Sequence, residues 1–135
     1  MTNKTTYDLI QTYYQAFNEE NIEKFMSTLH PEVIHGICQG STEIGKDAFQ
    51  KFMEFCFDVC KENARDIIII ASDDGRYAAS KLMIDGIYLK DIANYPAANN
   101  QKYSLPVHAF FEIKDGLVYR ISCFYNQKDW ISQVS

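Results

Sequence analysis

The stretch LPVHAFFEIKDGLVYRISCFYN, residues 105–126, decides the fold of this chain. Its central Lys-Asp-Gly is typical of a hairpin turn, and the residues on either side alternate as they do in two β-strands. Both parities of the first strand are apolar: Val107 and Phe111 share one face, and His108 and Phe110 share the other. A sheet that is apolar on both faces must be covered on both.

Hydrophobic periodicity places the remaining elements. A first helix, capped by Thr5 or Thr6, is expected to run to residue 20, and two more helices are expected over 21–29 and 46–62. Glu62 belongs to a narrow polar stripe of the third helix. Besides the hairpin, strands are predicted over residues 32–40, 65–72 and 76–90. The strand over 65–72 is expected to be buried, and Gly86 is expected to mark a bulge or bend in the strand over 76–90.

Helices that precede a run of consecutive strands predict an α+β fold, with an antiparallel sheet packed against three helices. The chain has 135 residues, which corresponds to one domain spanning residues 1–135. The helices cover one face of the sheet, and the second apolar face then needs a partner. The simplest partner is a second copy across a two-fold axis, so a homodimer through the outer sheet face is expected.

The composition excludes several function classes. The net charge is −5 and no run of Lys or Arg occurs, whereas binding to nucleic acid or to an anionic membrane needs clustered cations. No apolar segment approaches the roughly 20 residues of a membrane-spanning helix, and the N-terminal residues lack an apolar signal core. We therefore expect a cytoplasmic protein with no nucleic-acid or membrane partner.

The four cysteines, Cys38, Cys56, Cys60 and Cys123, match no zinc-binding spacing. Cys56 and Cys60 lie one turn apart in the predicted third helix, where small buried hydrophobic residues are expected rather than a metal pair. The sequence also has no glycine-rich phosphate loop and no Ser-His-Asp order. Neither a metal nor a cofactor is expected.

Four segments carry a family resemblance: YYQAFNEENIEKFMSTLHPEVIHG, GKDAFQKFM, RDIIIIASDDGRYAA and LPVHAFFEIKDGLVYRISCFYNQKDWISQV. They resemble the SnoaL-like branch of the NTF2-like superfamily, and in particular the ketosteroid isomerase-related proteins. The resemblance implies a curved, cone-like antiparallel sheet wrapped around helices that enclose an apolar pocket, commonly in a dimer. Members of the superfamily include isomerases, polyketide cyclases and non-catalytic binding proteins, so the fold leaves the function open.

The resemblance also suggests catalytic residues. The oxyanion tyrosine of ketosteroid isomerases aligns with Tyr13, and their second oxyanion donor, an acid, aligns with His108. Their general base falls near Gly36 or Ile37, and neither residue can take up a proton. His35 is the nearest titratable group, and an ordinary histidine pKa near 6.5 suits acid–base chemistry at neutral pH.

The alternation of residues along each strand indicates which of the titratable side chains can face the pocket. His35 shares its parity with Val33 and Ile37, so it can point inward as base or donor, or be a strand histidine bonded to backbone. His108 shares the parity of Phe110, on the face that we assign to the pocket. Glu112 on the same face is a fallback carboxylate at the rim. Asp85 is expected on the outer face beside Lys81.

Parity and alignment together predict the pocket wall: Phe17, Leu82, Ile84, Phe110, Ile121, Cys123 and Tyr125. Trp130 is expected to close the mouth of the pocket or to pack on the dimer seam. Two functions remain open for an apolar ligand: cofactor-free proton transfer beside a carbonyl by Tyr13, His35 and His108, or binding without catalysis. A protein-interaction module of the NTF2 type is a third alternative.

Overall fold

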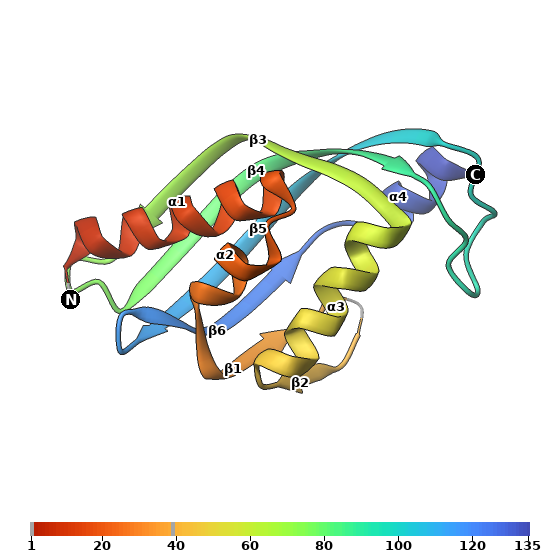
Figure 1. Cartoon of the computed structure of the whole chain (residues 1–135). Helices are drawn as coiled ribbons and strands as arrows, with labels where there is room; N and C mark the ends of the chain where they lie inside the picture. Colours follow the sequence, from red (N-terminus) through yellow and green to blue (C-terminus); the bar gives the residue numbers. More distant parts are fainter. Residues whose placement is uncertain (1, 39) are drawn as a thin grey trace.

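The computed structural model describes residues 2–38 and 40–135, and Figure 1 shows their arrangement. The elements in chain order are α1 (Asn3–Glu19), α2 (Ile22–Ser27), β1 (Leu29–Gly36), β2 (Thr42–Ile44), α3 (Lys46–Val59), β3 (Cys60–Ala71), β4 (Tyr77–Tyr88), β5 (Gln101–Lys114), β6 (Leu117–Phe124) and α4 (Gln127–Val134).

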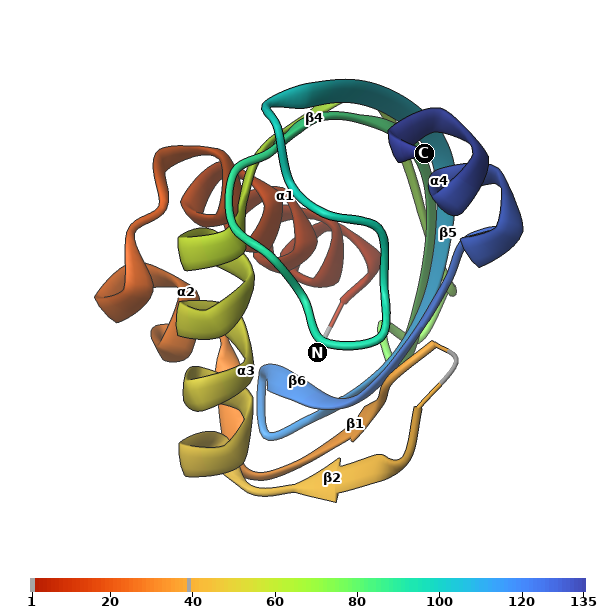
Figure 2. The ribbon, with the colours of Figure 1, turned by 90° about the vertical axis from the view of Figure 1, so that its right-hand side faces the viewer.

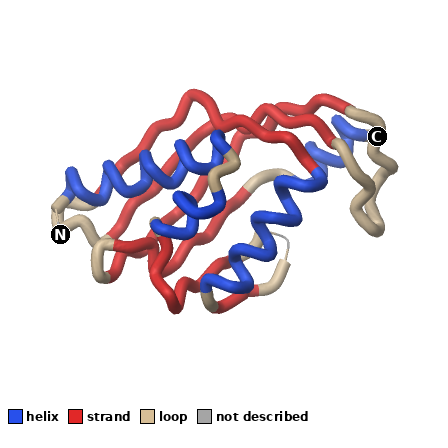
Figure 3. Tube along the Cα trace, in the orientation of Figure 1, coloured by secondary structure: helices blue, strands red, loops and turns tan. Residues whose placement is uncertain are grey.

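The strands form one sheet in the order β2-β1-β6-β5-β4-β3. It curves around α1 and α3 without closing, and helices and strands occupy separate layers (Figures 2 and 3). The predicted α+β class with a cone-like sheet is thereby confirmed. Two details differ from the expectation. β1 runs parallel to β6, and the C-terminal segment forms a fourth helix beside β5.

The hairpin turn forms as its sequence predicts. Lys114 pairs with Leu117, and the two residues between them, Asp115 and Gly116, have φ angles of 54° and 74°. Both positions lie in the left-handed region, which Asp tolerates and Gly adopts at no steric cost. The two-residue loop therefore sets the pairing next to the turn, and the register of β5 and β6 then shifts between Ile113 and Glu112.

The helix ends differ from the predicted ones. Thr2, and not Thr5 or Thr6, is the N-cap of α1, and it exchanges reciprocal hydrogen bonds with Thr5. Thr6 is buried, and its hydroxyl donates to the carbonyl of Gly75. At the other boundary α3 stops at Val59, because the chain begins to pair with β4 from the next residue onward.

The face of β5 that we assigned to the pocket is the wrong one. Val107 and Phe111 are buried, whereas His108 is exposed and Phe110 is 50% exposed. α1 decides between the two apolar faces, because the ring of Tyr13 packs edge-on against Phe111 with 5.5 Å between centroids. His108 and Phe110 therefore lie on the outer face of the sheet.

The strand predicted over residues 65–72 forms as part of β3, but the expectation that it is buried is wrong. Ile68 and Ile70 are 55% and 67% exposed, on a strand that forms one edge of the sheet. The predicted bulge at Gly86 is absent from the described ladder, where Gly86 pairs with Glu62 in regular register. The register shift between β3 and β4 occurs instead between Arg65 and Ile68. Within residues 2–38 and 40–135, no helix is long and apolar enough to cross a bilayer.

Candidate functional site

A cavity of about 410 Å³ lies between the helices and the inner face of the sheet. Its wall is mainly aromatic and aliphatic and comes from α1, α3, α4 and from all the strands except β2. Six of the predicted wall residues line it: Phe17, Leu82, Ile84, Ile121, Cys123 and Tyr125. Trp130 also lines the cavity, and it packs edge-on against Tyr88, Tyr95 and Tyr103. Phe110 lies on the other side of the sheet.

A carboxylate that sequence analysis missed lies in this cavity. Glu62 lines it, and the phenol of Tyr103 donates a hydrogen bond of 2.5 Å to Glu62 Oε2. Burial raises the pKa of the Glu62 carboxyl above its usual value, and the Tyr103 hydrogen bond opposes this only in part. The charge pattern put Glu62 on the polar stripe of a helix. Because α3 ends at Val59, Glu62 belongs to β3 and shares its inward parity with Cys60.

Gly86 makes room for this pair. Glu62, Gly86 and Tyr103 lie in one row across β3, β4 and β5, because Gly86 pairs with both of the others. A Cβ atom at residue 86 would lie 2.1 Å from Tyr103 Cζ and 2.4 Å from its hydroxyl oxygen. The glycine is therefore required because the Tyr103 ring lies directly over its backbone on the way to Glu62.

Tyr13 lies in the same cavity, on α1. Its ring contacts Tyr14, Phe25 and Phe111, with centroid distances of 5.1, 4.6 and 5.5 Å. Burial holds the pKa of its phenol well above the ordinary value, and the neighbouring Tyr14 adds to this. Tyr13 is therefore a neutral hydrogen-bond donor at any physiological pH.

His35 reaches the cavity from β1. Its ring stacks on Phe49 with 4.0 Å between centroids and meets the edge of Phe52 at 4.8 Å. Burial lowers the pKa of His35 from 6.5 to about 4, so the imidazole is neutral at pH 7. One cavity thus contains Tyr13 of α1, His35 of β1 and Glu62 of β3, although three strands separate β1 from β3 in the sheet.

The other predicted acid–base residues lie outside the cavity. His108 is exposed on the outer face, between Lys81 and Phe124 in the ladder. Glu112 was expected at the rim of the cavity, but on the outer face it forms an ion pair of 2.9 Å with Arg120.

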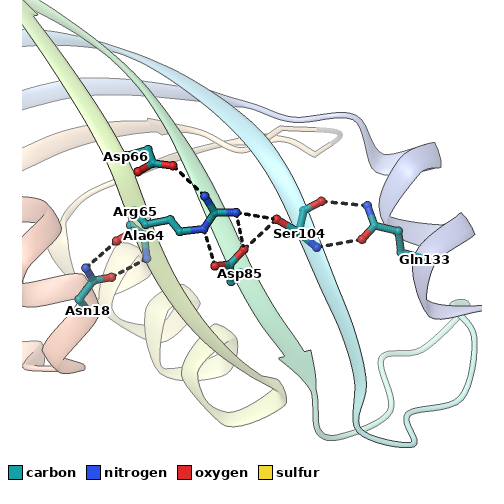
Figure 4. Close-up of polar contacts among 7 residues, drawn as sticks. All are labelled: Asn18, Ala64, Arg65, Asp66, Asp85, Ser104 and Gln133. Carbon is teal, nitrogen blue, oxygen red and sulfur yellow. Dashed lines mark hydrogen bonds and ion pairs between the residues drawn. The ribbon is translucent and has the colours of Figure 1, made fainter.

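Asp85 lies on the outer face, as expected. The Arg65 guanidinium donates to it at 2.6 Å and Ser104 Oγ at 2.7 Å (Figure 4). These hydrogen bonds, that of Arg65 first, hold the pKa of the Asp85 carboxyl below its usual value.

Two side-chain amides support the strands that carry Glu62 and Tyr103 (Figure 4). Asn18 on α1 donates to the Ala64 carbonyl at 2.9 Å and accepts from the Ala64 amide at 2.7 Å. Gln133 on α4 makes the same two-way contact with the backbone of Ser104. Each amide pairs with a backbone N–H and C=O that would otherwise pair with a neighbouring strand. Side chains therefore hold the backbone next to Glu62 and Tyr103 in place.

All four cysteines, Cys38, Cys56, Cys60 and Cys123, also line the cavity. Burial raises the pKa of the Cys56 and Cys123 thiols to about 12 and that of Cys60 to about 11. Since the thiolate is the nucleophile, protonated thiols contribute apolar wall and not reactivity. Within the part of the chain that the structure describes, no group of three or more His, Cys, Asp or Glu side chains is placed to hold a metal ion.

The curved sheet around helices agrees with the comparison to known families. The SnoaL-like domain matches residues 10–121 of the sequence. The chain belongs to the SnoaL-like family. No protein of curated function matches this SnoaL-like chain.

Several solved structures resemble the chain over its whole length. Three described as proposed polyketide cyclases are 38%, 36% and 33% identical, with TM-scores of 0.95, 0.97 and 0.95; they come from Pseudomonas putida, Xanthomonas campestris pv. campestris and Silicibacter sp.. All of this chain is covered in each, together with 99%, 100% and 98% of the other chain. An NTF2-like protein from Burkholderia xenovorans is 8% identical with a TM-score of 0.76, which shows the shared fold alone.

Proposed function

We propose that this SnoaL-like protein is a cofactor-independent enzyme of the isomerase or cyclase type, which moves a proton next to a carbonyl of an apolar small molecule. The observation that carries the proposal is the Glu62 carboxyl in the cavity, hydrogen-bonded by Tyr103 and with a raised pKa. A carboxylate whose pKa is raised above its ordinary value is a stronger general base once it is ionised. The family assignment, together with relatives described as proposed polyketide cyclases, supports the same class of reaction.

In the proposed reaction the Glu62 carboxylate takes a proton from the carbon beside the ligand carbonyl. The electron pair of the broken C–H bond moves onto the carbonyl oxygen and forms an enolate. The neutral phenol of Tyr13 donates a hydrogen bond to that oxygen. The enolate then either takes the proton back from Glu62 at another carbon of its conjugated system, which isomerises the ligand, or its carbon attacks a second carbonyl. In the second case a ring closes, and the oxygen of the attacked carbonyl takes up the proton held by Glu62. Tyr103 acts through Glu62 by holding its carboxylate.

The cavity fits an apolar ligand. A volume of about 410 Å³ lies within the range of about 300–1,000 Å³ that is usual for small-molecule sites. The wall is mainly apolar, and several of its polar groups are hydrogen-bonded within the protein: Tyr14 with Ser80, Tyr103 with Glu62 and Tyr95 with Gln127. The ligand is therefore expected to be mostly hydrocarbon with one or two oxygen functions. A protein that only binds such a ligand would have the same wall, and catalysis must therefore be tested directly.

The test is deuterium uptake. The protein is incubated in D₂O with β,γ-unsaturated and polycyclic ketones, and deuterium at the acidic carbon is measured by mass spectrometry. We expect E62Q to lower the rate at least about 100-fold, because a positioned base contributes about 10²–10⁴. E112Q is the matched control, since Glu112 pairs with Arg120 on the outer face. Ketones that bind without exchange in the wild type would make this a binding protein.

We also propose that a second copy of the chain covers the outer sheet face. Ile70 and Phe110 flank Ala79 in one row of the ladder, and Ile68 and Phe124 belong to the next row. Cations and carboxylates surround these apolar residues on the same face: Arg65, Lys81, Arg120, Asp85 and Glu112. A face with charges of both signs can pair with its own copy across a two-fold axis.

Light scattering tests this assembly. The wild type is expected to have the mass of a dimer, and F110D to have that of a monomer. I44D is the matched control, because Ile44 is 71% exposed but lies on β2, away from the apolar rows. A monomeric wild type would contradict the proposal.

A further inference from the structure

Two buried polar atoms lack a hydrogen-bond partner among the described residues: Nδ1 of His35 and Oε1 of Glu43. They belong to residues that face each other directly across the β1–β2 ladder. Buried side-chain nitrogens and oxygens are rarely unpaired, so the coincidence of two of them on one cross-strand pair needs a physical explanation.

Both side chains point to the same side of the sheet. Directly opposed residues of an antiparallel pair share a face, and their Cβ atoms are typically about 5 Å apart. The neighbours of Glu43, Thr42 and Ile44, are exposed, which leaves Glu43 on the inner side with α3. Because neither atom has a protein partner, one water molecule between the carboxylate and the imidazole would satisfy both.

The surroundings of His35 determine which nitrogen meets which neighbour. Its ring lies flat against Phe49 and edge-on to Phe52, so it is held in one plane. The Nδ1 atom is enclosed by protein, yet the residue as a whole lines the cavity. We infer that the Nδ1 edge of the ring is turned towards β2 and that the Nε2 edge is the one the cavity meets.

We propose that Glu43 is a positioning residue: its carboxylate accepts a hydrogen bond from one water molecule, which itself accepts a hydrogen bond from Nδ1–H of His35, so that the Nε2 lone pair faces the cavity. The pair then presents a hydrogen-bond acceptor to the ligand. The chemical group that fits an acceptor in an apolar wall is a hydroxyl, either enolic or phenolic. The ligand implied by this cavity has a carbonyl near Glu62 and Tyr13 and a hydroxyl near His35. This ligand class rests on the proposed function, whereas the tautomer does not.

The direct test is the tautomer of His35, read from long-range ¹H–¹⁵N correlation spectra of protein labelled at histidine. The chain has three histidines, and H35F, which keeps an aromatic ring on Phe49, assigns the signal. We expect protonated Nδ1 and unprotonated Nε2 in the wild type at pH 7.5. Protonated Nε2 would overturn the proposal without the use of any Glu43 variant.

Variants at residue 43 test the cause. In E43A the Nδ1–H form is expected to give way to the Nε2–H form, and E43D is expected to restore part of it. T42A, a change at the exposed neighbour on β2, should leave the spectrum unchanged. An unchanged His35 tautomer in folded E43A would show that Glu43 does not position the ring.

Ligand binding separates this inference from the proposed function. E43A is expected to weaken binding of a hydroxylated ketone about tenfold, as loss of one well-aligned hydrogen bond predicts, with no change for the analogue without the hydroxyl. Calorimetry measures this binding, and the E62Q background prevents proton transfer during the titration. A negative deuterium test would not affect the inference about the His35 tautomer. The opposite tautomer would not affect the proposal that Glu62 transfers a proton. Equal loss for both ketones would contradict the acceptor role of His35.

Discussion

Glu62 and Asp85 are two carboxylates at the same corner of the sheet, but they lie on its opposite faces. In the β3–β4 ladder Glu62 pairs with Gly86, and Asp85 with the residue after Glu62. Burial beside a phenol raises the pKa of Glu62, whereas hydrogen bonds from Arg65 and Ser104 lower that of Asp85. The candidate base and the surface ion pair are therefore only one residue pair apart in the ladder. The face of the sheet on which a carboxyl lies determines whether its pKa is raised or lowered.

His35 and His108 also lie on opposite faces of the sheet and have different surroundings. His35 is 5% exposed, stacked on Phe49 and edge-on to Phe52, and burial lowers its pKa to about 4. His108 is exposed on the outer face beside Lys81 and Phe124. Residue type alone would treat the two alike. The following changes test whether the face of the sheet is what separates them.

The largest expected effect is on acid stability through His35. Its folded-state pKa of about 4 lies below the unfolded value of 6.5, so the unfolded chain takes up the proton first as pH falls. The free energy of unfolding should therefore drop by up to about 3 kcal/mol between pH 6.5 and 4. Urea unfolding at several pH values measures it, and H35F should abolish this part of the pH dependence. H108F should not, and equal effects of both variants would break the comparison.

The next largest effect is a loss of stability expected from a substitution at Gly86, which lies between Glu62 and Tyr103 in the sheet. G86A would place a Cβ atom 2.1 Å from the Tyr103 ring, and such overpacking costs about 1–3 kcal/mol. G36A is the matched control, since its nearest contact would be Ser122 Oγ at 3.2 Å.

A double variant identifies the cause of this effect. In a Y103A background the ring is gone, so G86A should cost less of the free energy of unfolding than it does in the wild type. Additive costs in G86A/Y103A would mean that the glycine serves some purpose other than the passage of the Tyr103 ring.

A smaller effect is expected from Y103F. The phenol hydrogen bond lowers the pKa of Glu62 against the burial that raises it, so its removal should raise that pKa further. The acidic limb of the kcat/KM profile for proton transfer should then move to higher pH, with a loss at pH 7 of less than about tenfold. Y77F, at a half-exposed tyrosine of β4, provides the control. A limb that moves to lower pH would contradict the assignment of the limb to Glu62.

The smallest effect is expected from H108A. Deuterium uptake should stay within about twofold of the wild-type rate, because exposed substitutions away from a site rarely propagate. A tenfold loss in a variant with the wild-type oligomeric state would place His108 in the reaction after all.

Much of the fold follows from local sequence. The Asp115-Gly116 loop sets the hairpin, and the apolar stripe of α1 turns Tyr13 inward. Both signals act within a few residues, where turn geometry and helical period dominate the free energy. The inward parity of His35 on β1 follows from its alternation in the same way.

The chemistry of the cavity was decided by tertiary contacts. Both faces of β5 are apolar, so only the packing of α1 on Phe111 shows that His108 faces outward. Glu62 continues the polar pattern of α3, and only the pairing of β3 with β4 ends the helix at Val59 and turns the carboxylate inward. Tyr103 reaches Glu62 across Gly86, an arrangement of three residues on three strands. Sequence by itself thus determined the fold and two residues of the site, and pairing over long sequence separations determined the acid, because no local pattern records which strand lies opposite a glycine.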